Sequence, residues 1–183
     1  LALKYRLSDT ATIKLATGIY HQYLHRIPRF IATDIWTTSN RYQDASRAVH
    51  YIAGFQQEWA RNWQFEVETF YKSYDHIYQF NENFLTQLEE AGFDERNKPI
   101  ISSTKGLFNS GAGHSLGIEV LLRKDAGAIN GWLGYSLART RYTIDAINGA
   151  RAFNPRHDRT STLNLVANVD LRNALRKMRS EAK

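Results

Sequence analysis

The stretch VHYIAGFQQEWARNWQFEVETFYKSY, residues 49–74, contains the pattern that decides the fold. Apolar side chains occupy nearly every second position on both sides of a short connection at residues 60–62. This alternation is the period of a β-strand with one apolar and one polar face. The two halves of the stretch are therefore predicted to pair as a β-hairpin.

The same alternation recurs along the rest of the chain. It occurs in the segments 1–7, 11–22, 46–59, 63–78, 113–124, 128–143 and 159–171. Most of these segments have about 12 residues or more, whereas strands in soluble sheets average five or six. The sequence predicts an all-β protein, an antiparallel up-and-down meander of about seven long strands.

The connections between the predicted strands are alternately short and long. The short ones are 8–10, 60–62 and 124–127, and the long ones are roughly 23–45, 80–112 and 144–158. Because neighbouring strands run in opposite directions, all the long connections are expected at one end of the sheet. Long strands with this alternation are typical of transmembrane β-barrels. The sequence pattern therefore predicts a protein of the outer membrane of a Gram-negative bacterium.

Each face of such a sheet would then meet a different environment. The set expected to face lipid comprises Phe65, Val67, Leu116, Ile118, Val120, Leu122, Leu163 and Leu165, and the set expected to line a wet interior comprises Glu66, Glu68, Glu119 and Arg123. Trp59 and Trp63 flank one tight turn, with Tyr51 and Tyr71 farther along the same strands, as in two interfacial aromatic girdles. The alternative is ordinary aromatic packing within a soluble β-sheet.

Composition excludes some classes of protein and leaves others open. The 183 residues are 43% hydrophobic with a mean hydropathy of −0.49, and no stretch approaches 18 uninterrupted apolar residues, which excludes helical membrane spans. Cysteine is absent, as expected either in a reducing compartment or in a protein that crosses an oxidising periplasm unfolded. The net charge of +6 suggests acidic partners such as lipopolysaccharide.

No enzyme is indicated. The six histidines show no metal-binding spacing, and there is no nucleophile elbow or phosphate loop. Glu66 and Glu68 lie on one face, but a ladder of interior charges with Lys14, Lys72 and Arg123 is favoured over paired-carboxylate catalysis. We expect no cofactor, no metal and no nucleic-acid partner.

The long connections are where ligand contacts are expected, because loops on a rigid scaffold commonly carry recognition. In segment 23–45 the best candidates are Arg29, Trp36, Arg41 and Tyr42, since aromatic and arginine side chains supply contact area and charge-assisted hydrogen bonds. The competing interpretation is that these residues pack the loops together or bind lipopolysaccharide phosphates. Segment 80–112 includes FLTQLEEAGF, a predicted short helix. Asp158 and Arg159 are expected either to clamp a ligand or to form a salt bridge where the loop meets the strand.

Several motifs in order resemble the barrel of TonB-dependent outer-membrane receptors. They are Gly54 before a tight turn, the FYK strand at 70–72, Gly117-Ile118-Glu119, the GWLGYSL stretch at 131–137, and Asp158-Arg159 before LNLVANV. The resemblance covers residues 1–171. It implies a 22-stranded barrel, a separate N-terminal plug, and import of a ferric siderophore, haem, cobalamin or oligosaccharide, driven by the inner-membrane TonB complex.

The resemblance also divides the chain. Residues 1–171 would be part of the barrel, and residues 172–183 a basic tail that departs from the family pattern and is non-native or truncated. The plug, the TonB-binding segment and the closing strands are not in this sequence. The alternative function is that of a non-transport outer-membrane barrel, or a soluble β module, in adhesion or structure.

Overall fold

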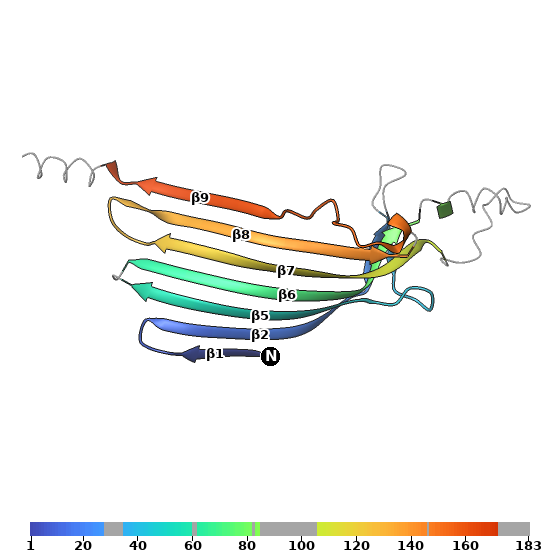
Figure 1. The fold of residues 1–183 in the computed structure, drawn as a ribbon, viewed down its shortest axis with the longest axis horizontal. Helices are drawn as coiled ribbons and strands as arrows, with labels where there is room; N and C mark the ends of the chain where they lie inside the picture. Colours follow the sequence, from blue (N-terminus) through green and yellow to red (C-terminus); the bar gives the residue numbers. More distant parts are fainter. Residues whose placement is uncertain (28–34, 60–61, 82, 85–105, 146, 172–183) are drawn as a thin grey trace, which may run out of the picture.

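The computed structural model describes residues 1–27, 35–59, 62–81, 83–84, 106–145 and 147–171. Seven long or medium strands form one antiparallel sheet (Figure 1). They are β1 Ala2–Arg6, β2 Ala11–Gln22, β5 Ser46–Trp59, β6 Trp63–Phe80, β7 Phe108–Lys124, β8 Ile129–Ile144 and β9 Ser161–Val169. Each pairs with its neighbour in this order, so the predicted all-β meander is confirmed. The sheet is not closed: in the described chain, β1 and β9 each pair on one side only.

Three strands differ from their predicted bounds by more than one residue. β7 begins at Phe108 instead of 113, β6 extends to Phe80, and β9 is shorter than the predicted 159–171. The early start of β7 includes the sequence FNSGAG, whose glycine and serine residues have low strand propensity. Pairing with β6 on one side and β8 on the other holds this segment extended despite its composition.

A small hairpin lies inside the predicted loop 23–45. Its strands are β3 Leu24–Ile27 and β4 Ile35–Thr38, and they form a separate two-stranded sheet. Strands of four residues are too short to produce a clear alternation, which is why the sequence pattern did not separate them from the loop. The three long connections leave the main sheet at one end, and the tight turns lie at the other (Figure 1).

Apart from the strands, the described elements include one 3-10 turn, η1 Asn148–Ala150. The predicted helix at 84–93 lies outside the described residues from position 85 onward, and so does the basic tail 172–183. No helix in the described part of the chain has the length and apolar character needed to cross a membrane.

The strand register separates the side chains into two sets. One cross-strand row contains only apolar residues and crosses all seven strands: Tyr5, Ile13, Phe55, Val67, Val120, Tyr135 and Leu163. The next row, one residue along each strand, points to the opposite side: Lys4, Lys14, Gly54, Glu68, Glu119, Ser136 and Thr162. We call the side of the first row the apolar face and the side of the second row the polar face. The predicted separation of Val67 and Val120 from Glu68 and Glu119 is confirmed.

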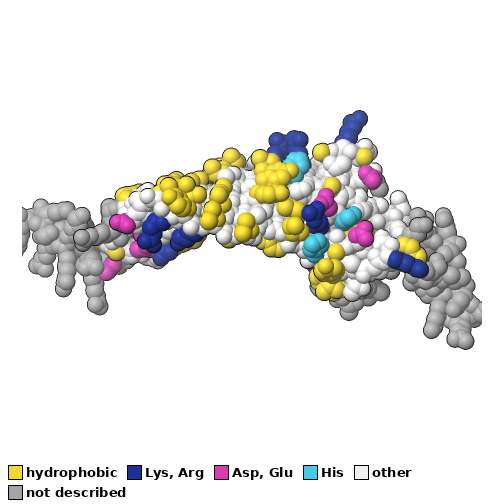
Figure 2. Space-filling model, turned by 90° about the horizontal axis from the view of Figure 1, so that it is seen from below, with side chains coloured by type: hydrophobic (Ala, Val, Ile, Leu, Met, Phe, Trp, Pro, Cys, Tyr) yellow, Lys and Arg dark blue, Asp and Glu magenta, His cyan; other side chains and the backbone are white. Residues whose placement is uncertain are grey.

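The apolar face is accessible. Leu163 and Leu165 are 64% and 68% exposed, and Leu116 and Ile118 are 49% and 40% exposed. Hydrophobic side chains gather along much of one side of the sheet in Figure 2. The buried apolar cluster lies instead at the loop end, where Phe80, Phe84 and Leu107 pack with Phe108. Among the described residues, no second layer of strands or helices covers the apolar face.

Two local features shape the loop end of the sheet. The register of β6 against β7 shifts between Tyr74 and Ile77, which leaves a bulge at Asp75 and His76, and His76 has a φ of 54°. Ser46 Oγ donates to the His76 carbonyl at 2.6 Å and braces this bulge.

The connection after β8 is not held by the predicted salt bridge between Asp158 and Arg159. Asp158 instead accepts from the Thr140 amide at 3.0 Å and from Asn154 Nδ2 at 2.9 Å.

Candidate ligand-binding site

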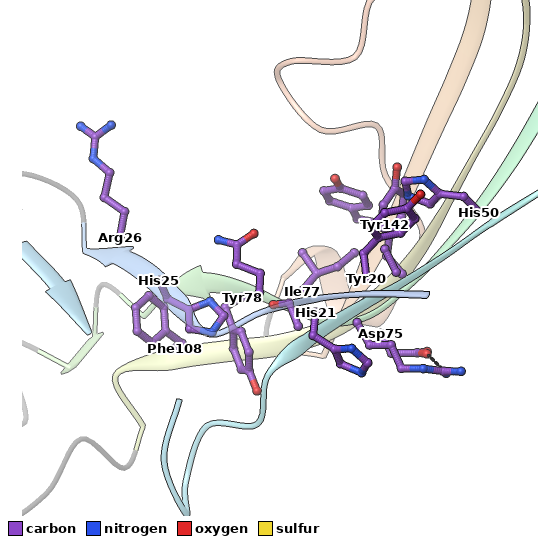
Figure 3. A pocket seen from close by; sticks show the side chains of 15 residues that line it. Tyr20, His21, His25, Arg26, His50, Asp75, Ile77, Tyr78, Phe108 and Tyr142 are labelled. Atoms are coloured by element: carbon purple, nitrogen blue, oxygen red, sulfur yellow. Dashed lines mark hydrogen bonds and ion pairs between the residues drawn. The ribbon is translucent and has the colours of Figure 1, made fainter. Parts of the chain in front are cut away.

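An open cavity of about 620 Å³ lies on the polar face at the loop end of the sheet. Its lining is contributed by β2, β3, β5, β6, β7 and β8, so residues from most of the chain meet there (Figure 3). Most of the bulky side chains that line it are aromatic or histidine. They are Tyr20, His21, His25, His50, Tyr74, Tyr78, Phe108 and Tyr142.

Strand parity explains why four of these rings, Tyr20, His50, Tyr74 and Tyr142, lie on one side of the sheet. Tyr20 and His50 occupy polar-face positions near the loop ends of β2 and β5, and Tyr74 and Tyr142 do so on β6 and β8. Between the last two, β7 carries Gly113, which is paired with both. A Cβ at Gly113 would lie 2.5 Å from Tyr142 Cδ1 and 2.7 Å from the Arg141 carbonyl oxygen. The missing side chain therefore lets the Tyr142 ring lie across β7.

Four of the rings form a continuous series. The Tyr20 and His50 ring centroids are 4.5 Å apart, those of His50 and Tyr74 are 6.5 Å apart, and those of Tyr74 and Tyr142 are 6.2 Å apart. The last two pairs are edge-to-face, the arrangement that aromatic quadrupoles favour. Beyond them, the Tyr142 hydroxyl lies 3.4 Å from His157 Nε2. The series therefore connects four strands of the sheet to the connection after β8.

A second group of rings attaches the β3–β4 hairpin to the sheet. The ring of His25, in β3, lies 4.8 Å from that of Tyr78, and the Tyr78 ring lies 5.9 Å from that of Phe108. His25 is buried, and its Nε2 is 3.3 Å from Ser39 Oγ. Burial lowers the pKa of His25, because the charged form would lose its hydration. Burial also raises the pKa of Tyr78, with the Asp44 carboxylate adding to the effect. Both side chains are therefore neutral near pH 7.

Formal charges are at the margin of the cavity. Arg47 and Asp75 form a 3.1 Å ion pair with one another. In Figure 3, His21 and Asp75 lie on the opposite side of the strands from Tyr20, His50 and Tyr142, while Arg26 extends away from the other lining side chains. Such a lining can stack against rings or the C–H faces of sugars, and its hydroxyl and imidazole groups can form hydrogen bonds.

Farther along the polar face lies the predicted charge ladder. Lys14 Nζ is 2.6 Å from Glu66 Oε1, which confirms one interaction of that ladder. Arg123 instead pairs with Asp125, at 2.5 Å, and the Lys72 ammonium lies 4.6 Å from the centre of the Phe70 ring. Among the described residues, no three histidine or acidic side chains group closely enough to hold a metal ion.

Of the four predicted ligand-binding residues, the three that the structure describes do not line this cavity. Arg29 lies outside the described residues. Trp36 is in β4, opposite Arg26, and is 55% exposed. Arg41 and Tyr42 lie together in the turn closed by Asn40 and Gln43, with the guanidinium 4.7 Å from the centre of the Tyr42 ring. Contact of these residues with a ligand stays a prediction.

The cavity residues were not predicted as a group. Each of Tyr20, His50, Tyr74 and Tyr142 is a polar-face aromatic or histidine within six residues of the loop end of its strand. That repeated placement was the available signal. These residues form a site only because the register places β2, β5, β6 and β8 close together, with only β7 between the last two, and the spacing along the sequence does not specify the register.

No protein-family model matches this chain, and a search of curated proteins finds no match for it either.

Proposed function

We propose that this chain is part of the β-barrel of a TonB-dependent receptor in the outer membrane of a Gram-negative bacterium. The observation that carries the proposal is the apolar face, a surface that crosses all seven strands and that none of the described elements covers. A soluble sheet buries such a surface under a second layer, because each exposed Å² of apolar surface costs about 25 cal/mol. In a bilayer the same surface is in contact with lipid, and no protein layer is needed.

The spacing of the aromatic residues supports the membrane assignment. Trp59 and Trp63 stack at the turn end of β5 and β6, with centroids 6.1 Å apart and an interplanar angle of 3°. Tyr51 and Tyr71 pair on the same face toward the loop end, 6.5 Å apart. Trp63 and Tyr71 are eight positions apart on β6, which corresponds to about 27 Å along the strand. At the usual strand tilt this corresponds to a height of about 20 Å, close to that of the apolar band of outer-membrane barrels.

The unpaired edges are consistent with a larger barrel. β1 and β9 present unpaired backbone groups on their outer edges, and barrels remove such edges by closure. A 22-stranded barrel supplies the remaining strands. The polar face would then line the interior, and the long connections would lie outside the cell.

Transport is the activity that we propose for the barrel. The aromatic cavity faces the interior at the loop end, where an incoming ligand is first enclosed. The imported ligand is a ferric siderophore, haem, cobalamin or an oligosaccharide, and the energy comes from the TonB complex acting through a plug domain. A lining rich in tyrosine and histidine suits a ligand with ring or sugar faces. Outer-membrane lipid and lipopolysaccharide are the other partners.

Two measurements on the complete protein test these proposals separately. Folding into phosphatidylcholine vesicles, followed by heat-modifiable gel mobility, tests membrane insertion, and failure to insert would contradict the barrel assignment. Binding of a panel of iron chelates, haem, cobalamin and oligosaccharides tests the transport class.

A pair of variants then locates the site. Deletion of residues 26–43 and the substitution Tyr142→Ala should each weaken binding at least tenfold while insertion is retained. Leu163→Ala, on the apolar face, is the matched control and should leave affinity unchanged. Unchanged affinity in both site variants would move the ligand to other interior residues or to the plug.

A further inference from the structure

The apolar face ends, toward the loops, in a group of basic side chains on β7 and β8. This outer basic cluster consists of His114, Arg139 and Arg141. His114 is directly opposite Arg141, and Arg139 is opposite Leu116, so all three lie on the apolar face. Lys, Arg and His side chains adjoin hydrophobic ones in the view of Figure 2.

The cluster starts where the aromatic residues mark the boundary of the apolar band. Leu116 pairs with both Tyr71 and Arg139, so Arg139 lies level with the Tyr51–Tyr71 pair. Arg141 is two residues farther toward the loops, about 7 Å along the strand. The His114 ring stacks on Tyr71, with centroids 6.3 Å apart and planes 21° apart. In a membrane this level corresponds to the lipid headgroups.

Among the residues that the structure describes, the two arginines of the cluster have no acidic partner. Arg47 binds Asp75 and Arg123 binds Asp125, but in the described part of the chain no carboxylate lies within ion-pair distance of Arg139 or Arg141. Both arginines are exposed, and Asp145 lies beyond the end of β8. Two arginines that lie two positions apart on one strand, about 7 Å along it, with no counter-charge among the described residues, favour an anionic ligand with more than one oxygen.

An apolar groove adjoins the cluster on the membrane side. It has a volume of about 440 Å³, and its lining includes Leu116, Ile118 and Leu137 together with Arg139. A soluble anion would use only the arginines. A lipid would use both features, with its charged head on the arginines and an acyl chain in the groove.

We propose that the outer basic cluster binds the phosphate groups of a multi-acylated glycolipid of the outer leaflet, the chemistry of lipopolysaccharide, and that one of its acyl chains lies in the adjoining groove. This inference rests on the proposed membrane barrel. It assigns the lipid partner to one place on the outer surface. It also separates this basic group from the arginines of the loops, which remain available to the imported ligand.

The test uses the complete protein in detergent micelles and native mass spectrometry to measure lipid adducts. The probes are a hexa-acylated, doubly phosphorylated glucosamine disaccharide lipid and the same lipid without phosphates. The variant is Arg139→Gln/Arg141→Gln. The matched control is Lys4→Gln/Arg6→Gln, which removes two basic residues at the same spacing from the polar face of β1.

The double arginine variant should bind the phosphorylated lipid about thirtyfold more weakly, since each arginine near a charged lipid surface contributes a factor of about five. The control variant should stay within twofold of the wild type, and the dephosphorylated lipid should bind the wild type about as weakly as the phosphorylated lipid binds the arginine variant. Leu137→Gln, which places an amide in the groove, should weaken binding of the phosphorylated lipid several-fold.

The opposite outcomes distinguish the two proposals. Equal lipid binding by the wild type and the arginine variant, or equal binding of the two lipids, overturns the cluster assignment while the barrel stands. Full competition by the free phosphorylated disaccharide at the same concentration would mean that the acyl chain contributes nothing, and would overturn the lipid assignment. A wild-type protein that does not insert into phosphatidylcholine vesicles contradicts the barrel itself.

Discussion

The two faces of this sheet are made by the same seven strands, yet they differ in almost every physical property. The apolar row from Tyr5 to Leu163 is uniform from strand to strand and is at least partly accessible on every strand, with Tyr5 and Leu163 exposed. The polar row beside it varies, with Lys14, Gly54 and Glu68 on successive strands. The first face is built for a homogeneous environment, and the second for specific contacts among side chains.

This difference between the faces predicts which substitutions should affect stability, and for what reason. On the apolar face a residue is constrained by the surrounding medium, so polarity should dominate the effect of a change. On the polar face a residue is constrained by its neighbours, as with Gly113 under Tyr142, so size and pairing should dominate. Matched substitutions on the two faces can separate these rules.

The largest effect is expected from a lysine at the centre of the apolar face. Val120 pairs with Val67, midway between the Trp63 and Tyr71 levels. Val120→Lys should reduce the free energy of unfolding of the liposome-inserted protein by about 2–4 kcal/mol, because a charge at the bilayer midplane is poorly solvated. Urea titration of the complete protein in phosphatidylcholine vesicles measures the change.

The control for that substitution is the adjacent residue. Glu119→Lys places the same side chain on the polar face and should cost less than about 1 kcal/mol, the usual range for an exposed charge. Equal costs at the two positions would mean that the apolar face does not meet lipid.

A smaller effect is expected from added volume on the polar face. Gly113→Val introduces a Cβ that would lie 2.5 Å from Tyr142, so the ring must move, at a cost of about 1–3 kcal/mol. Ala112→Val adds volume at the neighbouring exposed position and should change stability by less than about 0.5 kcal/mol. Urea titration measures both, and a mild effect at Gly113 would show that the Tyr142 ring relocates freely.

Acidification should affect the loop end of the polar face and leave the apolar face unchanged. Burial lowers the pKa of His25 in the folded protein below its ordinary value of 6.5. The unfolded hairpin therefore binds the proton more tightly, so this contribution to stability is complete above pH 6.5 and is lost as the pH falls toward the folded pKa. Amide hydrogen exchange should show β3 opening more often at pH 5.5 than at pH 7.5, after correction for intrinsic rates.

Two comparisons make the pH experiment specific. The paired amides of β7 and β8 around Val120 should show no such change, and His25→Gln should remove the pH dependence in β3. A pH response that persists in the variant would assign it to another group.

The smallest effect is expected at the ion pair of the polar face. Lys14 and Glu66 have side chains 34% and 22% exposed, so water screens their interaction. Lys14→Gln should cost about 0.2–1 kcal/mol in urea titration, and Lys4→Gln, which removes a neighbouring lysine without an ion pair, should cost less. A loss of several kcal/mol would mean that the interior around Glu66 excludes water.

Much of the fold could be predicted from the alternation. The segments 11–22 and 46–59 match β2 and β5, because long stretches of period two leave little choice of structure or of face. The early start of β7 was missed because residues 108–112 include serine and glycine, which weaken the strand signal; Gly111 lies against Thr143 and Ile144 of β8. The hairpin of β3 and β4 was missed because its strands are short.

The candidate site was harder to predict than the fold. The sequence predicts ligand contacts in the loops, at residues such as Trp36 and Tyr42, because loops generally carry recognition. The cavity instead depends on rings contributed by β2, β5, β6 and β8, with β7 between the last two, and their proximity follows from pairing across connections as long as residues 81–107. Parity along one strand indicates a face, but only the complete register shows which residues on that face are neighbours.

The neighbour-only order of the strands has a consequence for how the protein tolerates change over evolutionary time. Every strand of the main sheet after β1 pairs with the main-sheet strand before it. This holds for the short connection at residues 60–62 and for the long one at residues 81–107. Chain-closure entropy grows only with the logarithm of length, so the longer connection costs about 2 kcal/mol more than the shorter. Insertions at the loop end are therefore energetically inexpensive, whereas shifting a single strand by one residue would transfer its whole apolar set to the polar face. The loop end of the sheet is therefore free to vary in length while the register of the strands stays unchanged.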